Sequence, residues 1–172
     1  MTESKEGETT ERFLLLMRHA KSDWSDGSLA DHERPLNRRG REAAPAMANR
    51  LTEIGMVPNV ILSSSSTRTQ ETAELLTKEW SSQPKTTFKD SLYLAPPETL
   101  LRAVRNGSGE SQKVMVLAHN PSMAQLSSVL AKQHIEMPTA AVAIFELKDL
   151  EWKWIDSDTP MKLLHSMRPK AL

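Results

Sequence analysis

The amino-acid sequence predicts an α/β domain with a mostly parallel sheet and an antiparallel edge. Short apolar runs of strand length alternate along the chain with longer stretches in which apolar residues recur every three or four positions. Helix-start residues, an Asn or a Pro, stand before several of the longer stretches. Strands that alternate with helices are typical of parallel sheets, because each helix returns the chain to the edge where the previous strand began.

The first strand and the first helix are predicted from periodicity and capping. Phe13–Met17 reads FLLLM, which suits a strand buried on both faces. Asn37 is an N-cap residue for a helix that runs to about Ile54. Pro45 lies inside this helix and predicts either a kink or a later start. One face of the helix carries the apolar side chains Ala44, Met47, Leu51 and Ile54.

The remaining elements continue the alternation. They are strands at Asn59–Leu62, Thr86–Lys89 and Lys113–Ala118, and helices at Thr67–Trp80 and Pro97–Arg105. Asn120 as N-cap and Pro121 at the first helical position predict a last helix to about Gln133. Ala140–Leu147 and Glu151–Asp156 are predicted to form a closing hairpin around 148–150, with Trp152 and Trp154 alternating on its second strand. The segment from Pro160 gives no clear signal.

Composition limits the possible functions. The 172 residues fit one domain, expected at 13–172 and preceded by a flexible polar tail at 1–12. Lys plus Arg and Asp plus Glu both number 22, so no basic surplus suggests a nucleic acid or membrane surface as partner. The chain has no Cys and no His-rich ligand spacing, so no metal or other cofactor is expected. With 6 Gly it has no Gly-rich nucleotide loop. Neither a signal peptide nor a membrane-spanning run is visible, and the expected location is the cytoplasm.

Basic residues follow three separate predicted strands. Arg18 and His19 come directly after the first strand, Arg68 follows the second at the start of a helix, and His119 follows the strand Lys113–Ala118. Ligands of open parallel sheets bind at the carboxyl ends of the strands. These four side chains are therefore expected to meet at one edge of the sheet, where helix N-termini add free N–H groups. The sequence predicts a pocket for a compact anion, most simply phosphate.

Other polar residues are expected to have structural roles. His32 is interpreted as a surface loop residue and Lys21 as a solvated lysine near the pocket mouth. Arg34 is interpreted as a loop anchor that forms an ion pair, with a position facing the substrate as the alternative. No motif surrounds His134 or His165.

Four segments resemble the histidine phosphatase superfamily. LLLMRHAKSDW is similar to its first signature, Arg-His-Gly after the first strand, with Ala20 in place of the Gly. SSSSTRTQETA resembles the second signature, which carries a second phosphate-binding arginine, and LAHNPSM resembles the third, which carries a second histidine. RPLNRRGREAA resembles the segment after the first signature, and together with the small size it favours the SixA-type phosphohistidine phosphatase branch. The resemblance covers residues 13 to about 147.

The resemblance implies a three-layer α/β/α fold like that of phosphoglycerate mutase and a covalent mechanism. His19 would attack phosphorus and form a phosphohistidine that water hydrolyses. Arg18, Arg68 and His119 would bind the phosphoryl oxygens. Ser22 matches a small hydroxyl position of the first signature, so it is interpreted either as a phosphate contact or as a turn cap. A backbone carbonyl is expected to orient His19.

The leaving group points to a substrate class. Larger family members place a carboxylic acid between the second arginine and the second histidine, where this chain offers only Asp90, Glu98 and Glu110 without a matching pattern. Glu98 and, in the first loop, Asp23 are the candidate general acids, with Glu33 as a further substitute. An enzyme without a strong acid should prefer phosphoramidates. The leading substrate is therefore phosphohistidine on a protein. The alternatives are a small phosphomonoester or diphosphate, or a phosphate-binding regulator without catalysis.

Overall fold

The computed structural model describes residues 10–170, and its elements follow the predicted alternation. The strands are β1 (Glu11–Arg18), β2 (Val60–Ser64), β3 (Lys85–Lys89), β4 (Lys113–Ala118), β5 (Val142–Lys148) and β6 (Lys162–Met167). The helices are α1 (Arg38–Glu53), α2 (Thr67–Lys78), α3 (Pro97–Gly107) and α4 (Ser122–Ala131), with 3-10 turns at Asp31–Glu33, Asp90–Leu92 and Trp152–Trp154.

All six strands form one sheet in the order β3-β2-β4-β1-β5-β6. β3, β2, β4 and β1 run parallel to one another, whereas β5 is antiparallel to β1 and β6 is antiparallel to β5. The predicted parallel sheet with an antiparallel edge is confirmed. β1 and β4 occupy the two central positions, so the segments that follow them lie next to each other.

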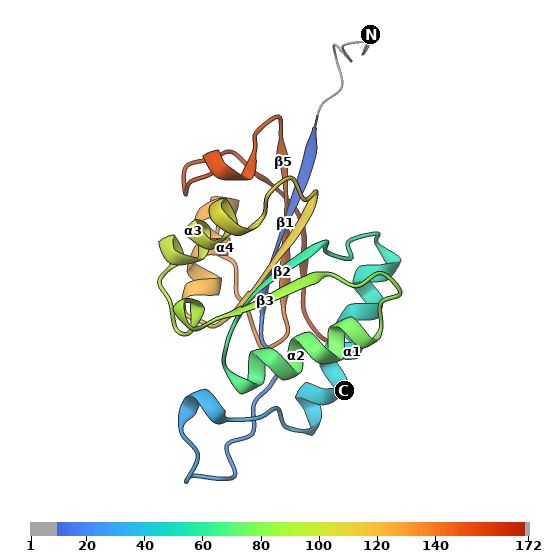
Figure 1. Ribbon diagram of the computed structural model, residues 1–172, viewed down its shortest axis with the longest axis vertical. Helices are drawn as coiled ribbons and strands as arrows, with labels where there is room; N and C mark the ends of the chain where they lie inside the picture. The colour runs from blue at the N-terminus through green and yellow to red at the C-terminus, as the bar shows by residue number, and fades with distance from the viewer. Residues whose placement is uncertain (1–9, 171–172) are drawn as a thin grey trace.

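Helices cover both faces of the sheet (Figure 1). Successive side chains of a strand point to opposite faces, and the apolar residues of β1 divide accordingly. Leu14 and Leu16 pack in the core under α3 and α4, whereas Leu15 and Met17 pack in the core under α1 and α2. The three-layer α/β/α arrangement is therefore confirmed, and β1 is buried because both layers press on it.

The start of α1 follows the capping prediction. The side chain of Asn37 accepts a hydrogen bond from the Gly40 amide at 2.9 Å, which satisfies one of the free N–H groups of the first turn. The helix begins at Arg38 and includes Pro45, so the expected later start is wrong. Gly40 packs directly on the backbone of Lys21, and a Cβ at position 40 would lie 2.3 Å from the Lys21 carbonyl oxygen.

The predicted second strand of the hairpin is wrong. Glu151–Asp156 contains a 3-10 turn at Trp152–Trp154, and the strand that pairs with β5 is β6, in the segment that gave no clear signal. Trp152 is 1% exposed and donates from Nε1 to the Ser111 carbonyl, whereas Trp154 is 64% exposed. The two indoles differ in exposure because the turn buries one of them, and not because they lie on opposite faces of a strand.

Two smaller boundaries also differ from the predictions. β1 begins at Glu11, so residues 11 and 12 belong to the sheet and not to the predicted polar tail, whose residues 1–9 lie outside the described part of the chain. α4 begins at Ser122 with Pro121 as its N-cap residue, one position later than expected. Asn120 still accepts a hydrogen bond from the Ala124 amide through its side chain. Within residues 10–170, none of the helices has the length and apolar character needed to cross a membrane.

Candidate active site

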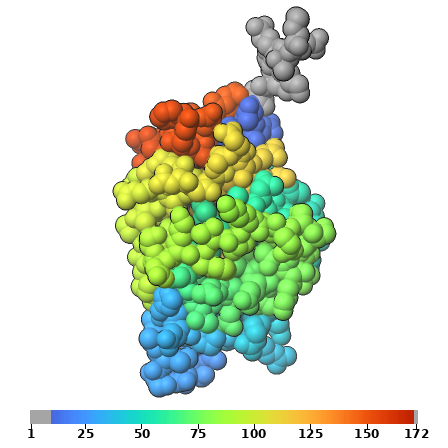
Figure 2. Space-filling model, viewed as in Figure 1, coloured from blue at the N-terminus to red at the C-terminus, as the bar shows by residue number. Residues whose placement is uncertain are grey.

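The carboxyl ends of β1, β4 and β2 meet at one edge of the sheet, as predicted. Arg18 pairs with Ala118 across β1 and β4, and Leu117 pairs with Ser63 across β4 and β2. The residues that follow these strands therefore surround one pocket of about 430 Å³. Its lining comprises Arg18, His19, Lys21, Ser22, Trp24, Asp31, Arg68, Leu94, His119, Asn120 and Thr139. The loop between β1 and α1 projects beside it as a separate lobe (Figure 2).

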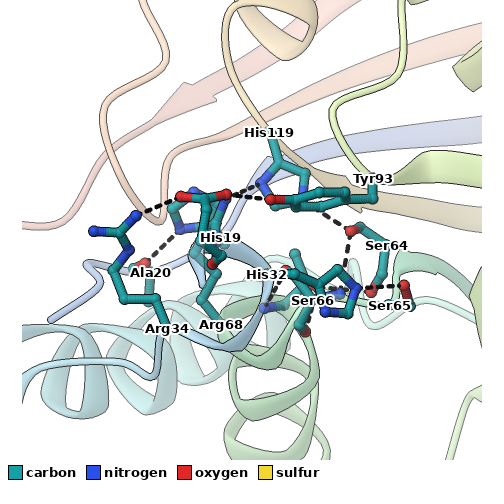
Figure 3. Close-up of polar contacts among 12 residues, drawn as sticks. His19, Ala20, His32, Arg34, Ser64, Ser65, Ser66, Arg68, Tyr93 and His119 are labelled. Atoms are coloured by element: carbon teal, nitrogen blue, oxygen red, sulfur yellow. Dashed lines mark hydrogen bonds and ion pairs between the residues drawn. The ribbon is translucent and has the colours of Figure 1, made fainter. Parts of the chain in front are cut away.

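The His19 side chain is fixed by a backbone hydrogen bond. Its Nδ1 lies 2.6 Å from the Ala20 carbonyl oxygen, which can only accept, so Nδ1 carries a proton and donates (Figure 3). This tautomer leaves the lone pair on Nε2. Burial, reinforced by the nearby Arg68 and Arg18, lowers the pKa of His19 to about 4, although the Ala20 carbonyl acts in the opposite direction. His19 is therefore a neutral imidazole at neutral pH, with one nitrogen available as a nucleophile.

His119 and Arg68 form a second buried pair. Arg68 donates from Nη2 toward Nδ1 of His119 at 3.3 Å, so the proton of this imidazole is on Nε2, which donates to Oγ of Ser64 at 2.8 Å. Burial, with the nearby His19 and Arg68, lowers the pKa of His119 to about 3. The centroids of the His19 and His119 rings are 5.2 Å apart, which places both rings at the floor of one pocket.

Arg18 presents an incompletely satisfied guanidinium to the pocket. Its Nη1 donates to the Met137 carbonyl oxygen at 3.2 Å, but its Nε is buried without a hydrogen-bond partner. Burial and the nearby Arg68 lower the pKa of Arg18, so the local environment disfavours this concentration of positive charge. An anion that accepts hydrogen bonds from both arginines would relieve this repulsion.

Asp31 is a pocket residue that sequence reasoning missed. It accepts hydrogen bonds from Arg68 at 3.0 Å, from Arg34 at 2.5 Å and from the Tyr93 hydroxyl. Partial burial would raise its pKa, but these three donors outweigh burial and hold the pKa well below its usual range. Asp31 is therefore an ionised carboxylate that holds Arg68 in place. The only signal for it was its position in the DHERPLNRRG segment.

The serine run Ser63–Ser66 supports these groups. Ser66 caps α2 by accepting from the Thr69 amide, which fixes the helix turn that carries Arg68. Ser64 holds His119 as described, and Ser65 accepts from Nε2 of His32 and donates to Asp90. The loop residue His32 is thus tied to the end of β2 through Ser65, which agrees with a structural role.

Comparisons with known proteins agree with this geometry. The family profile of the histidine phosphatase superfamily (branch 1) matches residues 14–90. An uncharacterized protein of Mycobacterium tuberculosis is 33% identical over 127 residues, which cover 74% of this chain and 76% of that protein. An uncharacterized chloroplastic protein of Arabidopsis thaliana is 29% identical over 155 residues, which cover 83% of this chain and 69% of that protein. The chain belongs to the histidine phosphatase superfamily.

Solved structures of several phosphatases share the fold. A candidate phosphohistidine phosphatase SixA from Agrobacterium tumefaciens superposes with a TM-score of 0.76 at 25% identity, covering 92% of this chain and 99% of that one. The protein histidine phosphatase SixA in complex with tungstate gives a TM-score of 0.71 at 21% identity, covering 91% of this chain and 97% of that one. A mycobacterial glucosyl-3-phosphoglycerate phosphatase gives a TM-score of 0.62 at 17% identity, covering 89% of this chain and 97% of that one. A histidine phosphatase acts on a phosphorylated substrate, and the names of these structural neighbours refer to different substrates.

The pocket of this histidine phosphatase contains some of the predicted site residues and not others. Arg18, His19, Ser22, Arg68 and His119 all line it, and Ser22 is buried there. Neither candidate general acid does. Asp23 accepts a hydrogen bond from the Ser25 amide within its own loop, and Glu98 pairs with Arg105 on α3. The carboxylate in the lining is Asp31.

Proposed function

We propose that this chain is a phosphatase that uses His19 as nucleophile and takes phosphoryl groups from phosphohistidine on a protein. The observation that carries the proposal is the state of His19. It is a buried, neutral imidazole whose Nδ1 is tied to a carbonyl and whose Nε2 faces a pocket with two guanidinium groups. Such an imidazole attacks an electrophile without first losing a proton.

The reaction proceeds in two balanced steps. In the first, Nε2 of His19 forms a bond to phosphorus, the bond from phosphorus to the substrate nitrogen breaks, and the released imidazole takes up a proton from solvent. In the second, water forms a new P–O bond, the Nε2–P bond breaks with its electron pair returning to Nε2, and the excess proton leaves with phosphate or solvent. Arg18 and Arg68 hold the phosphoryl oxygens in both steps, and His119 positions Arg68 through its Nδ1.

The charge state of Asp31 supports a nitrogen leaving group. An alkoxide leaves poorly unless an acid protonates it, whereas a phosphohistidine nitrogen is protonated readily before or during departure. Asp31 is the carboxylate of the pocket lining, and its three hydrogen-bond donors keep it ionised. An ionised carboxylate has no proton to give, so the pocket as described suits a leaving group that needs little acid catalysis.

The principal alternative is phosphatase action on a small phosphomonoester or diphosphate. One structural neighbour is a mycobacterial glucosyl-3-phosphoglycerate phosphatase, so the same fold accommodates a sugar-derived phosphomonoester. A phosphate-binding regulator without turnover would also need the arginines. It would not need a neutral imidazole with a free Nε2, and so the state of His19 favours an enzyme.

The first experiment traps the covalent intermediate. Brief incubation with a ³²P-labelled phosphohistidine protein, followed by alkaline denaturation, should leave label on His19, because a phosphoramidate is stable to base and labile to acid. His19→Ala should lose the label and the turnover while its thermal unfolding stays cooperative. His134→Ala is the matched control, since His134 is an exposed histidine paired with Glu136. Label on a serine or aspartate would reject the mechanism.

The second experiment ranks the leaving groups. We expect kcat/KM to be highest for a phosphohistidine protein, lower for p-nitrophenyl phosphate, and lowest for a panel of sugar phosphates. A sugar phosphate that exceeds the phosphohistidine protein by tenfold or more would refute the substrate class and leave the nucleophile standing. Absence of turnover for every substrate, with tight phosphate binding, would support the regulator.

A further inference from the structure

A second hollow opens directly beside the catalytic pocket. It has a volume of about 340 Å³ and shares the lining residues Lys21 and Thr139 with that pocket, so the two are adjacent. Its walls come from the start of α1 and from the segment after β6. Arg50 of α1 donates to the Arg168 carbonyl at 2.6 Å, which fixes that segment against the helix. We call this hollow the basic groove.

The lining of the basic groove is strongly cationic. Lys21, Arg39, Arg168 and Lys170 contribute four positive charges, and no carboxylate belongs to its described lining. Acidic groups line two neighbouring hollows. Glu42, which pairs with Arg38 at 3.1 Å, and Glu53 line the hollow that shares Lys170, and Glu136 lines the hollow that shares Arg168. Because the whole chain has a formal net charge of zero, this concentration of positive charge is a local feature. A groove lined by one sign of charge raises the local concentration of a ligand of the opposite sign.

The rim of the catalytic pocket carries exposed apolar side chains. Trp24 is 72% exposed and Leu94 is 56% exposed, and both line the pocket. The guanidinium carbon of Arg34 lies 3.4 Å from the centroid of the Trp24 ring, and Arg34 also pairs with Asp31. The exposed indole is therefore held in place before any ligand arrives. Aromatic side chains held in this way are typical anchors of protein–protein contacts.

We propose that the basic groove and the Trp24–Leu94 rim together form a docking surface for the acidic face of a protein substrate. The phosphorylated residue of that protein would enter the catalytic pocket, and carboxylates next to it would lie along Lys21, Arg39 and Arg168. This inference rests on the proposed function and adds the chemistry of the partner. Apart from Lys21, which lines both hollows, the charges to which it assigns substrate selection lie outside the catalytic pocket.

The test compares two synthetic peptides that share one phosphohistidine. One peptide is flanked by four glutamates and the other by four glutamines, and p-nitrophenyl phosphate serves as a probe that reaches only the catalytic pocket. At low ionic strength we expect kcat/KM for the acidic peptide to exceed that for the neutral one by about tenfold, since steering by a charged cleft raises association rates by at least that factor. The preference should shrink as salt is added, because exposed charges are screened.

The variant Arg39→Gln/Arg168→Gln should remove the preference and leave p-nitrophenyl phosphate turnover unchanged. Arg39→Lys retains the charge and should retain the preference. The matched control is Lys85→Gln/Arg102→Gln, which removes two exposed cations on β3 and α3 that do not line the groove. It should behave as the wild type does.

The outcomes separate this inference from the proposed function. Equal rates for the two peptides, or a preference that survives Arg39→Gln/Arg168→Gln, would overturn the docking surface and leave phosphohistidine hydrolysis intact. Turnover of p-nitrophenyl phosphate with neither peptide dephosphorylated would overturn the proposed substrate itself. A small diphosphate that outperforms the acidic peptide, with the gain lost in the double variant, would assign the groove to a second phosphate and overturn the docking surface.

Discussion

The neutral state of His19 should be visible directly in a pH titration. The pKa of about 4 results mainly from burial, reinforced by the repulsion of Arg68 and Arg18. Relative to an ordinary histidine at 6.5, the shift of about 2.5 pH units corresponds to about 3 kcal/mol in favour of the neutral form. At pH 5, roughly 90% of His19 should be neutral, compared with about 3% of an unperturbed imidazole.

The assay is a heteronuclear NMR titration of the histidine Hε1 resonances between pH 3.5 and 8. The His19 signal is assigned by its loss in His19→Gln, and it should show its inflection near pH 4. The same residue in the urea-unfolded chain is the matched control and should titrate near pH 6.5. In Arg68→Met the inflection should move upward, because a repelling charge has been removed. An inflection at pH 6 or above in the folded wild type would refute the assignment of His19 as a neutral nucleophile.

The same shift has a consequence for stability. Between pH 6.5 and 4 the unfolded chain binds a proton at His19 that the folded chain excludes, so the free energy of unfolding falls as the pH falls through this window. The loss attributable to His19 reaches about 3 kcal/mol at its lower end, and His119 acts in the same direction. Urea denaturation at a series of pH values measures this slope. A flat profile from pH 7 to 4 would contradict it.

Three substitutions extend the reasoning. Arg68→Ala should lower kcat/KM by about a hundredfold or more, as expected for loss of a donor to transferring oxygens, with the exposed Arg102→Ala as an unaffected control; a loss below fivefold would remove Arg68 from the mechanism. Asp31→Asn should lower the vanadate inhibition constant about tenfold, because a negative charge beside the oxyanion site disappears. A selective hundredfold loss of kcat/KM for alkyl phosphates would instead identify Asp31 as a proton donor. Gly40→Ala should lower Tm by about 5 °C, because the new Cβ meets the Lys21 backbone and the resulting overpacking costs about 2 kcal/mol. Gly27→Ala is the control and should leave Tm unchanged, since no atom lies within 4 Å of its added Cβ.

The part of the site that the sequence predicted is the part attached directly to strands. Arg18, His19 and His119 lie at or next to the ends of β1 and β4, and Arg68 lies in the first turn of α2, so their positions follow from the strand order alone. The hydrophobic runs determine the strands, and the end of each strand determines where the residue that follows it in the chain must lie. This chain of inference needs no knowledge of loop conformation.

Asp31 could not be found in the same way. It lies in a loop between β1 and α1, where neither periodicity nor strand register restricts a side chain. Its role depends on long-range hydrogen bonds to Arg68 and Tyr93, which are separated from it by 37 and 62 positions. The closing strand was misplaced for a related reason. Alternating tryptophans indicate a strand, but Trp152 instead turns into the layer of α3, a choice set by tertiary packing.

Because β1 is central in the sheet, backbone amides around the catalytic pocket are expected to exchange with solvent at two different rates. Backbone amides of a buried central strand exchange with solvent only in the rarest, most global openings, whereas amides of surface loops exchange through frequent local ones. The strand that leads into His19 is hydrogen-bonded on both sides, by β4 and by β5. Asp31, Arg34 and Trp24 belong instead to the projecting loop. The nucleophile thus follows a strand whose amides are expected to exchange slowly, whereas Asp31, Arg34 and Trp24 lie on a loop whose amides should exchange faster although contacts among their side chains hold them in place.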